Sequence, residues 1–159
     1  MRRKIGVFIG EITSEYQQIV LQSIFKKAKS LNYDVFAFCN FGAYGDKLLY
    51  AEGEKGVIRI PHFSKFDAII VAEDTFDIDG MEVEIQDLIK SEAKCPVVYL
   101  RASNNTYYNI IIENQVAMAD MTRHFIRHHG YRDICFMTGD MKSEDAQMRY
   151  YSFLRTMEE

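Results

Sequence analysis

The sequence predicts an α/β fold with a doubly wound, mostly parallel sheet. Short apolar segments alternate along the chain with segments whose apolar residues recur at helical spacing. This alternation is typical of a parallel sheet that carries helices on both faces. Hydrophobic residues make up 48% of the 159 residues and charged residues 26%, close to the averages of folded soluble domains, so a disordered chain is excluded.

The first strand and the first helix are predicted at the start of the chain. Residues 4–9 are a nearly continuous apolar run, as expected for a central strand that is covered on both faces. Ser14 is a candidate N-cap, and Glu15 is favourably placed in the first helical turn. The helix then continues to about Leu31, with an apolar stripe at one face. The stripe consists of Val20, Ile24, Ala28 and Leu31.

The next part of the chain combines a strand with irregular structure. Residues 34–39 are predicted as the second strand, and residues 40–56 as a loop with room for one short helix. Residues 57–60 are predicted as a short strand. Pro61 ends it, because proline lacks the N–H group that a ladder needs.

Three further strands and one helix complete the first part of the predicted sheet. Strands are expected at residues 66–72, at 97–100 and at 109–112. A charged amphipathic helix is expected at residues 82–92. Its apolar residues available to face inward are Val83, Ile85, Leu88 and Ile89.

The C-terminal part predicts a helix, a strand and a second helix. The first helix covers residues 114–129 and ends at Gly130, which is well placed as its C′ residue. Residues 133–138 are predicted as a sixth strand and residues 144–157 as the last helix. The apolar stripe of the first of these helices contains Ala117, Met121 and Phe125, flanked by Met118 and Ile126.

The three cysteines indicate a reducing compartment. Cys39, Cys95 and Cys135 lie far apart and form no pattern typical of a disulfide framework or a zinc ribbon. Cys135 lies in an apolar run, where a free thiol is expected to be buried. Unpaired thiols without an export signal favour the cytoplasm.

A ligand site is expected where the loops leave the carboxyl ends of the strands, because these loops converge on one crevice. The loops are residues 10–14 with Tyr16 just beyond, 40–44, 73–77, 101–105 and 139–144. They carry carboxylate, guanidinium, amide, hydroxyl and aromatic groups, among them Glu73 and Arg101. This mixture suits a polar small molecule. Glu73 and Asp74 are adjacent, so their side chains are expected to point apart and at most one of them to contact a ligand.

The sequence contains no catalytic, cofactor or metal motif. The glycine fingerprints of nucleotide-binding loops are absent, as are GxSxG and HExxH. Residues 75–86 lack the acidic end positions of a calcium loop. His124, His128 and His129 are attributed to a helix C-terminus, where the helix dipole favours cations. A net charge of −4 and the lack of a long apolar run argue against nucleic-acid contact by this segment and against membrane insertion.

Residues 116–139 and 146–153 resemble the ligand-binding domain of LacI/GalR-type regulators. In that family a helix leads to a Gly-His/Tyr turn, to an apolar strand that ends in Gly, and then to an Arg-x-x-Gly-Phe/Tyr segment. The residues that fill this pattern are Ile126, Gly130, Tyr131, Ile134, Gly139, Arg149 and Phe153. Ser152 replaces the usual glycine. Residues 5–36 are similar to the family's first strand, first helix and second strand.

The resemblance implies two lobes of the type 1 periplasmic-binding-protein-like fold. Residues 1–112 would form the N-terminal lobe, and residues 113–159 the crossover and an incomplete start of the second lobe. The family pattern places ligand contacts at Tyr16, at Asn114 and at Arg149, with Glu113 in place of the usual aspartate. The ligand class is a small polar molecule such as a sugar or a nucleoside, and no cofactor is implied.

The resemblance leaves the output module open. Strand-like residues start directly after the N-terminus, so a DNA-reading segment is expected to lie elsewhere, if one exists. Residues 66–76 and this direct start also look like LacI-like sensor domains in front of GGDEF diguanylate cyclases or kinases. A flavodoxin-like enzyme is the remaining alternative. We expect a homodimer, because family members associate through helices of the first lobe.

Overall fold

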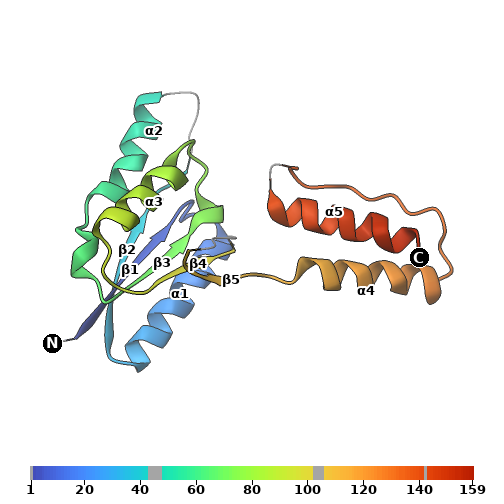
Figure 1. Ribbon diagram of the computed structural model, residues 1–159, viewed down its shortest axis with the longest axis horizontal. Helices are drawn as coiled ribbons and strands as arrows, with labels where there is room; N and C mark the ends of the chain where they lie inside the picture. Colours follow the sequence, from blue (N-terminus) through green and yellow to red (C-terminus); the bar gives the residue numbers. More distant parts are fainter. Residues whose placement is uncertain (1, 43–47, 102–105, 142) are drawn as a thin grey trace. The chain divides into compact units, whose positions relative to one another are not determined.

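The computed structural model describes residues 2–42, 48–101, 106–141 and 143–159. The chain divides into two compact units, residues Met1–Ile111 and Ile112–Glu159, and we describe each unit by itself (Figure 1). We refer to them as unit 1 and unit 2.

Unit 1 contains a sheet of five strands in the order β2-β1-β3-β4-β5. The strands are β1 (Arg3–Ile9), β2 (Tyr33–Cys39), β3 (Ala68–Ala72), β4 (Val97–Leu100) and β5 (Tyr108–Ile110). All four neighbouring pairs are parallel, with Val7 opposite both Ala37 of β2 and Ile70 of β3. The predicted α/β class and parallel sheet are therefore confirmed.

Helices cover both faces of this sheet (Figure 1). Helix α1 (Glu15–Ser30) packs with Val20, Leu21 and Ile24 on the face that carries Val7 and Ile9. Helices α2 (Leu48–Lys55) and α3 (Met81–Glu92) lie on the opposite face, where Phe8 belongs to the larger apolar core. Alternate residues of β1 thus enter two cores, which explains its uninterrupted apolar sequence.

Three details of unit 1 differ from the prediction. Residues Gly56–Arg59 form a 3₁₀ helix rather than a strand, because Ile58 packs into the core on the face of the sheet and not at its edge. Val83 of α3 is exposed. Ser14 occupies the predicted N-cap position of α1 with extended backbone, but its side chain makes no capping hydrogen bond.

Unit 2 is a pair of helices, α4 (Asn114–Arg127) and α5 (Glu144–Met157), joined by an extended segment (Figure 1). The two helices run in the same direction, since Gln115 and then Arg123 of α4 contact Ser152 and then Glu159. Ser152 Oγ donates to Gln115 O (2.7 Å), and Arg123 pairs with Glu159. The predicted stripe of α4 is wrong at Ala117 and Met121, which are exposed, whereas Phe125 and Ile126 are half-buried. Its flanking residue Met118 is buried, together with Ala119 and Thr122.

The contact between α4 and α5 explains why the buried face of α4 differs from the predicted one. Thr122, Ser152 and Thr156 are small hydroxyl residues that are almost fully buried. Their hydroxyl groups donate to backbone carbonyls of their own or of the facing helix. Small side chains let the helices approach closely, and the serine that replaces the glycine of the family pattern adds a hydrogen bond between them.

The predicted sixth strand is not formed. Residues 133–138 pair with no other strand in the described part of the chain. A strand needs a neighbouring strand to satisfy its backbone hydrogen bonds, so this segment stays extended without forming one. Ile134 and Phe136 are half-buried, and the Phe136 ring stacks on Phe153 of α5 with a centroid distance of 4.8 Å. Cys135 is exposed, which corrects the expectation that it is buried.

Candidate functional site

The strand order of unit 1 places a topological switch point between β1 and β3. From β1 the chain leaves to β2 on one side, while β3, β4 and β5 follow on the other side. In open parallel sheets, ligands bind in the crevice at the carboxyl ends of the strands at this point. The segments that follow β1, β3 and β4 therefore define the candidate site of unit 1.

Buried hydrogen bonds fix the loops at this edge. Gly10 N donates to Thr75 Oγ1 (2.7 Å), and Glu11 N donates to Asn40 Oδ1 (3.1 Å). A Cβ atom at Gly10 would lie 2.1 Å from the carbonyl oxygen of Thr75, so this position requires glycine. Asn40 and Thr75 are 1% and 3% exposed, which makes them structural supports of the site rather than ligand contacts.

Tyr16, Asp74 and Arg101 come together at the mouth of this site. Arg101 Nη1 lies 3.2 Å from Asp74 Oδ2, and the guanidinium carbon lies 5.3 Å from the centre of the Tyr16 ring. The second distance is within the range of a cation–π contact. Arg101 has a φ of 54°, a left-handed conformation that is uncommon for a residue other than glycine. Such backbone strain is concentrated at functional sites in proteins.

Glu73 points toward α3 instead. Its Oε1 accepts a hydrogen bond from Gln86 Nε2 (2.6 Å), whereas Asp74 pairs with Arg101. Burial raises the pKa of the Glu73 carboxyl above its ordinary value, which the Gln86 hydrogen bond opposes and the nearby Glu82 charge reinforces. The two adjacent acids therefore have different partners on different elements.

Two buried polar oxygens at this edge have no hydrogen-bond partner among the described residues. They are Gln17 Oε1 and the Tyr99 hydroxyl. Gln17 is 6% exposed, and its Nε2 donates to Glu11 Oε2 (3.4 Å). Burial raises the pKa of Tyr99 well above its ordinary value. Buried polar atoms without a partner are costly, but both side chains are buried like the supports Asn40 and Thr75 and do not face the surface of the site.

A second polar cluster lies at the N-terminal ends of α4 and α5 in unit 2. Asn114 Nδ2 donates to Asp145 Oδ1 (2.8 Å), and Arg149 Nη1 donates to Asn114 Oδ1 (2.9 Å). Asn114 is 7% exposed, while Arg149 is half-buried. The Asn114 amide thus binds both the Asp145 carboxylate and the Arg149 guanidinium. The guanidinium retains further N–H groups that can donate to a ligand.

The structure groups the five predicted site residues into two sets. Tyr16 and Arg101 are in contact in unit 1, and Glu73 lies next to their partner Asp74 in the chain. Asn114 and Arg149 are hydrogen-bonded in unit 2. The prediction did not single out Gln17 or Asp145. A buried glutamine and an acid in the first turn of a helix carry no distinctive sequence signal.

The remaining predictions from the sequence concern other loop residues, metal binding and membrane insertion. Residues 43–44, 102–105 and 142 of the predicted loops lie outside the described residues. In the described ranges, no group of three or more His, Cys, Asp or Glu side chains could hold a metal ion. His124 Nε2 and His129 Nε2 lie 3.1 Å apart at the exposed end of α4. None of the described helices is both long and apolar enough to cross a membrane.

Comparisons with known proteins identify the fold. No protein-family model and no curated protein sequence matches the chain. The lac repressor dimer bound to operator and the anti-inducer ONPF matches 99% of the chain with a TM-score of 0.72 and 16% identity. The chain shares its fold with LacI-type repressors. It spans about half of that repressor, 51% of its length.

Two further LacI-type structures contain sugars. The periplasmic binding protein/LacI transcriptional regulator of Alkaliphilus metalliredigens, complexed with D-xylulofuranose, matches 98% of the chain and 52% of its own length, with a TM-score of 0.65 and 18% identity. The LacI family regulator CCPA of Weissella paramesenteroides, with bound sucrose, matches 98% of the chain and 53% of its own length, with a TM-score of 0.65 and 14% identity. The LacI-type fold therefore occurs in regulators with a bound sugar.

Proposed function

We propose that the chain is part of a cytoplasmic ligand-sensing domain that controls an attached output module and has no catalytic activity of its own. The observation that carries this proposal is the LacI-type fold over nearly the whole chain. The neighbouring structures are described as repressors and transcription regulators. The flavodoxin-like alternative has the same strand order, so the sheet alone does not distinguish the two.

The ligand is a sugar or another polyhydroxylated small molecule. Arg101 and Asp74 in unit 1, and Arg149 and Asn114 in unit 2, offer donors and acceptors in fixed geometry. Tyr16 adds an aromatic surface with 43% exposure, against which an apolar face of a sugar ring can pack. We infer that residues 1–112 and 113–159 belong to two lobes, and that a ligand which prefers one lobe arrangement transmits a signal.

The experiment that tests this function is a calorimetric titration. The complete gene product is titrated with a panel of monosaccharides, disaccharides and nucleosides. We expect one class to bind, and Arg101→Ala and Arg149→Ala each to weaken it about tenfold or more, as expected for a lost charge-assisted hydrogen bond. Arg59→Ala is the matched control, because Arg59 pairs with Glu84 outside both clusters. A panel without any binder contradicts the proposal.

The output that we propose is transcription control, with a helix-turn-helix encoded upstream. Its support is the description of the neighbouring structures as transcription regulators. Sequencing the flanking codons tests it, and a downstream GGDEF or kinase module in place of a helix-turn-helix would assign the sensor to signalling instead.

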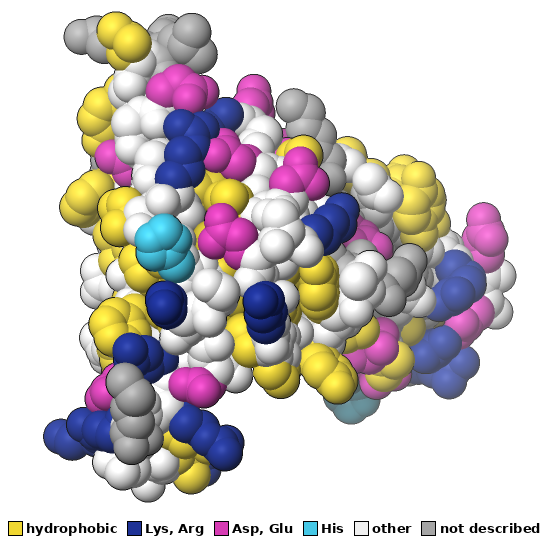
Figure 2. All heavy atoms as spheres, turned by 60° about the vertical axis from the view of Figure 1, so that its left-hand side comes forward, with side chains coloured by type: hydrophobic (Ala, Val, Ile, Leu, Met, Phe, Trp, Pro, Cys, Tyr) yellow, Lys and Arg dark blue, Asp and Glu magenta, His cyan; other side chains and the backbone are white. Residues whose placement is uncertain are grey.

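We also propose a homodimer. Its support is an apolar groove of about 360 Å³ between α1 and the sheet, lined by Ile5, Ile24, Ala28, Leu31, Tyr33 and Ile70 among others. Figure 2 shows further hydrophobic side chains exposed among charged groups of both signs. Contiguous apolar surface of this kind marks protein contacts, and three of the neighbouring structures are described as dimers. Light scattering at micromolar concentration is expected to return twice the monomer mass.

A further inference from the structure

A basic cavity lies at the C-terminal ends of α4 and α5, at the opposite end of unit 2 from Asn114 and Arg149. It has a volume of about 430 Å³. Its lining consists of Arg123, Ile126, Arg127, Gly130, Arg132, Thr156 and Glu159. Helix α4 has 14 residues, so this cavity lies roughly 20 Å from the first residue of that helix. It is therefore separate from the cluster that we assign to the sensed ligand.

The chain builds this cavity by turning back after α4. Gly130 has a φ of 71°, a conformation that glycine adopts without steric cost. The turn returns Arg132 to the same cavity as Arg127, although Arg132 lies outside the helix. Attraction to the dipole of α4 explains cations in the last turn of that helix, but it does not explain a third guanidinium from the following segment.

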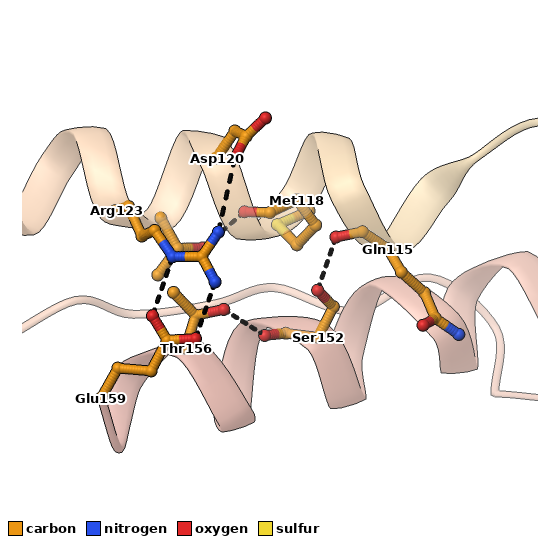
Figure 3. Close-up of polar contacts among 8 residues, drawn as sticks. Gln115, Met118, Asp120, Arg123, Ser152, Thr156 and Glu159 are labelled. Carbon is orange, nitrogen blue, oxygen red and sulfur yellow. Dashed lines mark hydrogen bonds and ion pairs between the residues drawn. The ribbon is translucent and has the colours of Figure 1, made fainter.

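One carboxylate already occupies the cavity. Arg123 Nε and Nη2 donate to Glu159 Oε2 and Oε1 at 2.8 and 2.7 Å, a two-pronged contact that Figure 3 shows. The hydrogen bond from Arg123 lowers the pKa of the Glu159 carboxyl, and the charges of Arg123, Arg127 and Arg155 add to this effect. The cavity thus binds a carboxylate in the bidentate geometry that is typical of arginine–carboxylate pairs.

Arg123 also contacts Asp120, with 3.4 Å between Nη1 and Oδ1, so two carboxylates face the three arginines of the cavity and do not balance their charge. Arg127 and Arg132 are exposed, and neither makes an ion pair with a carboxylate in the described part of the chain. A carboxylate carries one negative charge and engages one fork. A phosphate group carries nearly two charges and three terminal oxygens, so it can accept hydrogen bonds from two guanidinium groups at once.

We propose that this cavity binds a small phosphate-bearing anion, and that Glu159 is an internal carboxylate which competes with that anion for Arg123. The anion displaces Glu159 from the fork of Arg123 and gains Arg127 and Arg132 as further donors. The cavity volume is in the range of small-molecule sites. This inference is independent of the sensor function proposed above, because it uses different residues of unit 2.

The test is calorimetric titration of the chain with inorganic phosphate, with chloride keeping the ionic strength constant because screening weakens exposed charge pairs. Glu159→Gln removes the competing charge at nearly constant size. We expect it to tighten phosphate binding about fivefold or more, and Arg123→Gln to weaken it about tenfold, as for a lost charge-assisted contact. Because Arg123→Gln also removes a contact between the helices, Arg132→Gln on the exposed segment provides a second variant, with weakening expected as well.

The matched control uses a similar ion pair in unit 1. Arg59 contacts the Glu84 carboxylate with Nε and Nη2, but Glu84 has no comparable ring of arginines around it among the described residues. Glu84→Gln is therefore expected to leave phosphate affinity unchanged. The proposal is overturned if Glu159→Gln does not tighten binding, if Arg132→Gln and Arg123→Gln bind phosphate as the unchanged chain does, or if Glu84→Gln has the same effect as Glu159→Gln.

Discussion

Unit 1 combines helices with a sheet, whereas the described elements of unit 2 are helices, and the two units reach different degrees of burial. In unit 1 the sheet separates two apolar cores, and Phe8, Ile69, Val71 and Tyr99 are fully buried. In unit 2 the best-buried contacts are small hydroxyl residues between α4 and α5, while Met137 is 92% and Tyr151 61% exposed. A helix pair and an unpaired extended segment have no sheet against which to bury their apolar side chains. The burial of apolar side chains in this chain therefore follows strand pairing.

The largest expected effect compares a phenylalanine in each unit. Phe8 stacks on Phe38 and Phe63 at 5.0 and 4.9 Å and is completely buried, so Phe8→Ala is expected to lower the free energy of unfolding by about 3–5 kcal/mol. Phe153 stacks mainly on Phe136 of the unpaired segment, which can relax around a cavity. Phe153→Ala is therefore expected to cost less, roughly 2 kcal/mol. Urea denaturation followed by circular dichroism measures both, and equal losses would contradict the comparison.

A smaller effect compares two glycines that follow apolar segments. A methyl group at Gly10 would meet the Thr75 carbonyl at 2.1 Å, so Gly10→Ala is expected to cost about 1–3 kcal/mol through backbone displacement. At Gly139 the nearest atom is the Ala146 Cβ at 3.5 Å, an ordinary contact. Gly139→Ala is expected to change stability by less than about 0.5 kcal/mol. Thermal unfolding of both variants checks this, and a large loss at Gly139 would indicate that unit 2 is more tightly packed than described.

The cysteines of the two units are expected to differ in reactivity, and this difference can be measured on the unsubstituted chain. Burial raises the pKa of the Cys39 and Cys95 thiols in unit 1, and the nearby Asp67 charge adds to this at Cys95. Cys135 in unit 2 is exposed. Since the thiolate is the nucleophile, iodoacetamide at neutral pH is expected to modify Cys135 first. Peptide mass spectrometry at successive times measures the order, and faster labelling of Cys39 would show that the edge of the sheet opens.

The smallest expected effect is a pair of opposite pH dependences. Burial raises the pKa of Glu73, so this group favours the folded state at low pH, and its contribution is lost as the pH rises through the folded pKa. Hydrogen bonding to Arg123 lowers the pKa of Glu159, so its contribution is present at neutral pH and is lost as the pH falls through the folded pKa. Glu73→Gln should therefore stabilise and Glu159→Gln destabilise the chain at pH 7. Unfolding midpoints between pH 3 and 7 test whether both differences shrink toward acid.

The sequence by itself determined the α/β class, the five strands of unit 1 and its three helices in outline. Continuous apolar runs and helical stripes are local signals, and they suffice where each element packs on a sheet. It also predicted Tyr16, Glu73, Arg101, Asn114 and Arg149 as ligand contacts, of which Tyr16, Asn114 and Arg149 came through the LacI/GalR resemblance, and these roles stay predictions. The structure joins Tyr16 to Arg101 and Asn114 to Arg149.

Only the tertiary structure decided what depends on partners distant in the sequence. Ile58 enters a core over the face of the sheet, so an apolar run that reads as a strand becomes a 3₁₀ helix. Residues 133–138 have strand-like composition, but a strand exists only with a neighbour. Asp74 and Glu159 are ordinary surface acids in the sequence, and the arginine that each one meets, Arg101 or Arg123, is brought to it by the path of the chain.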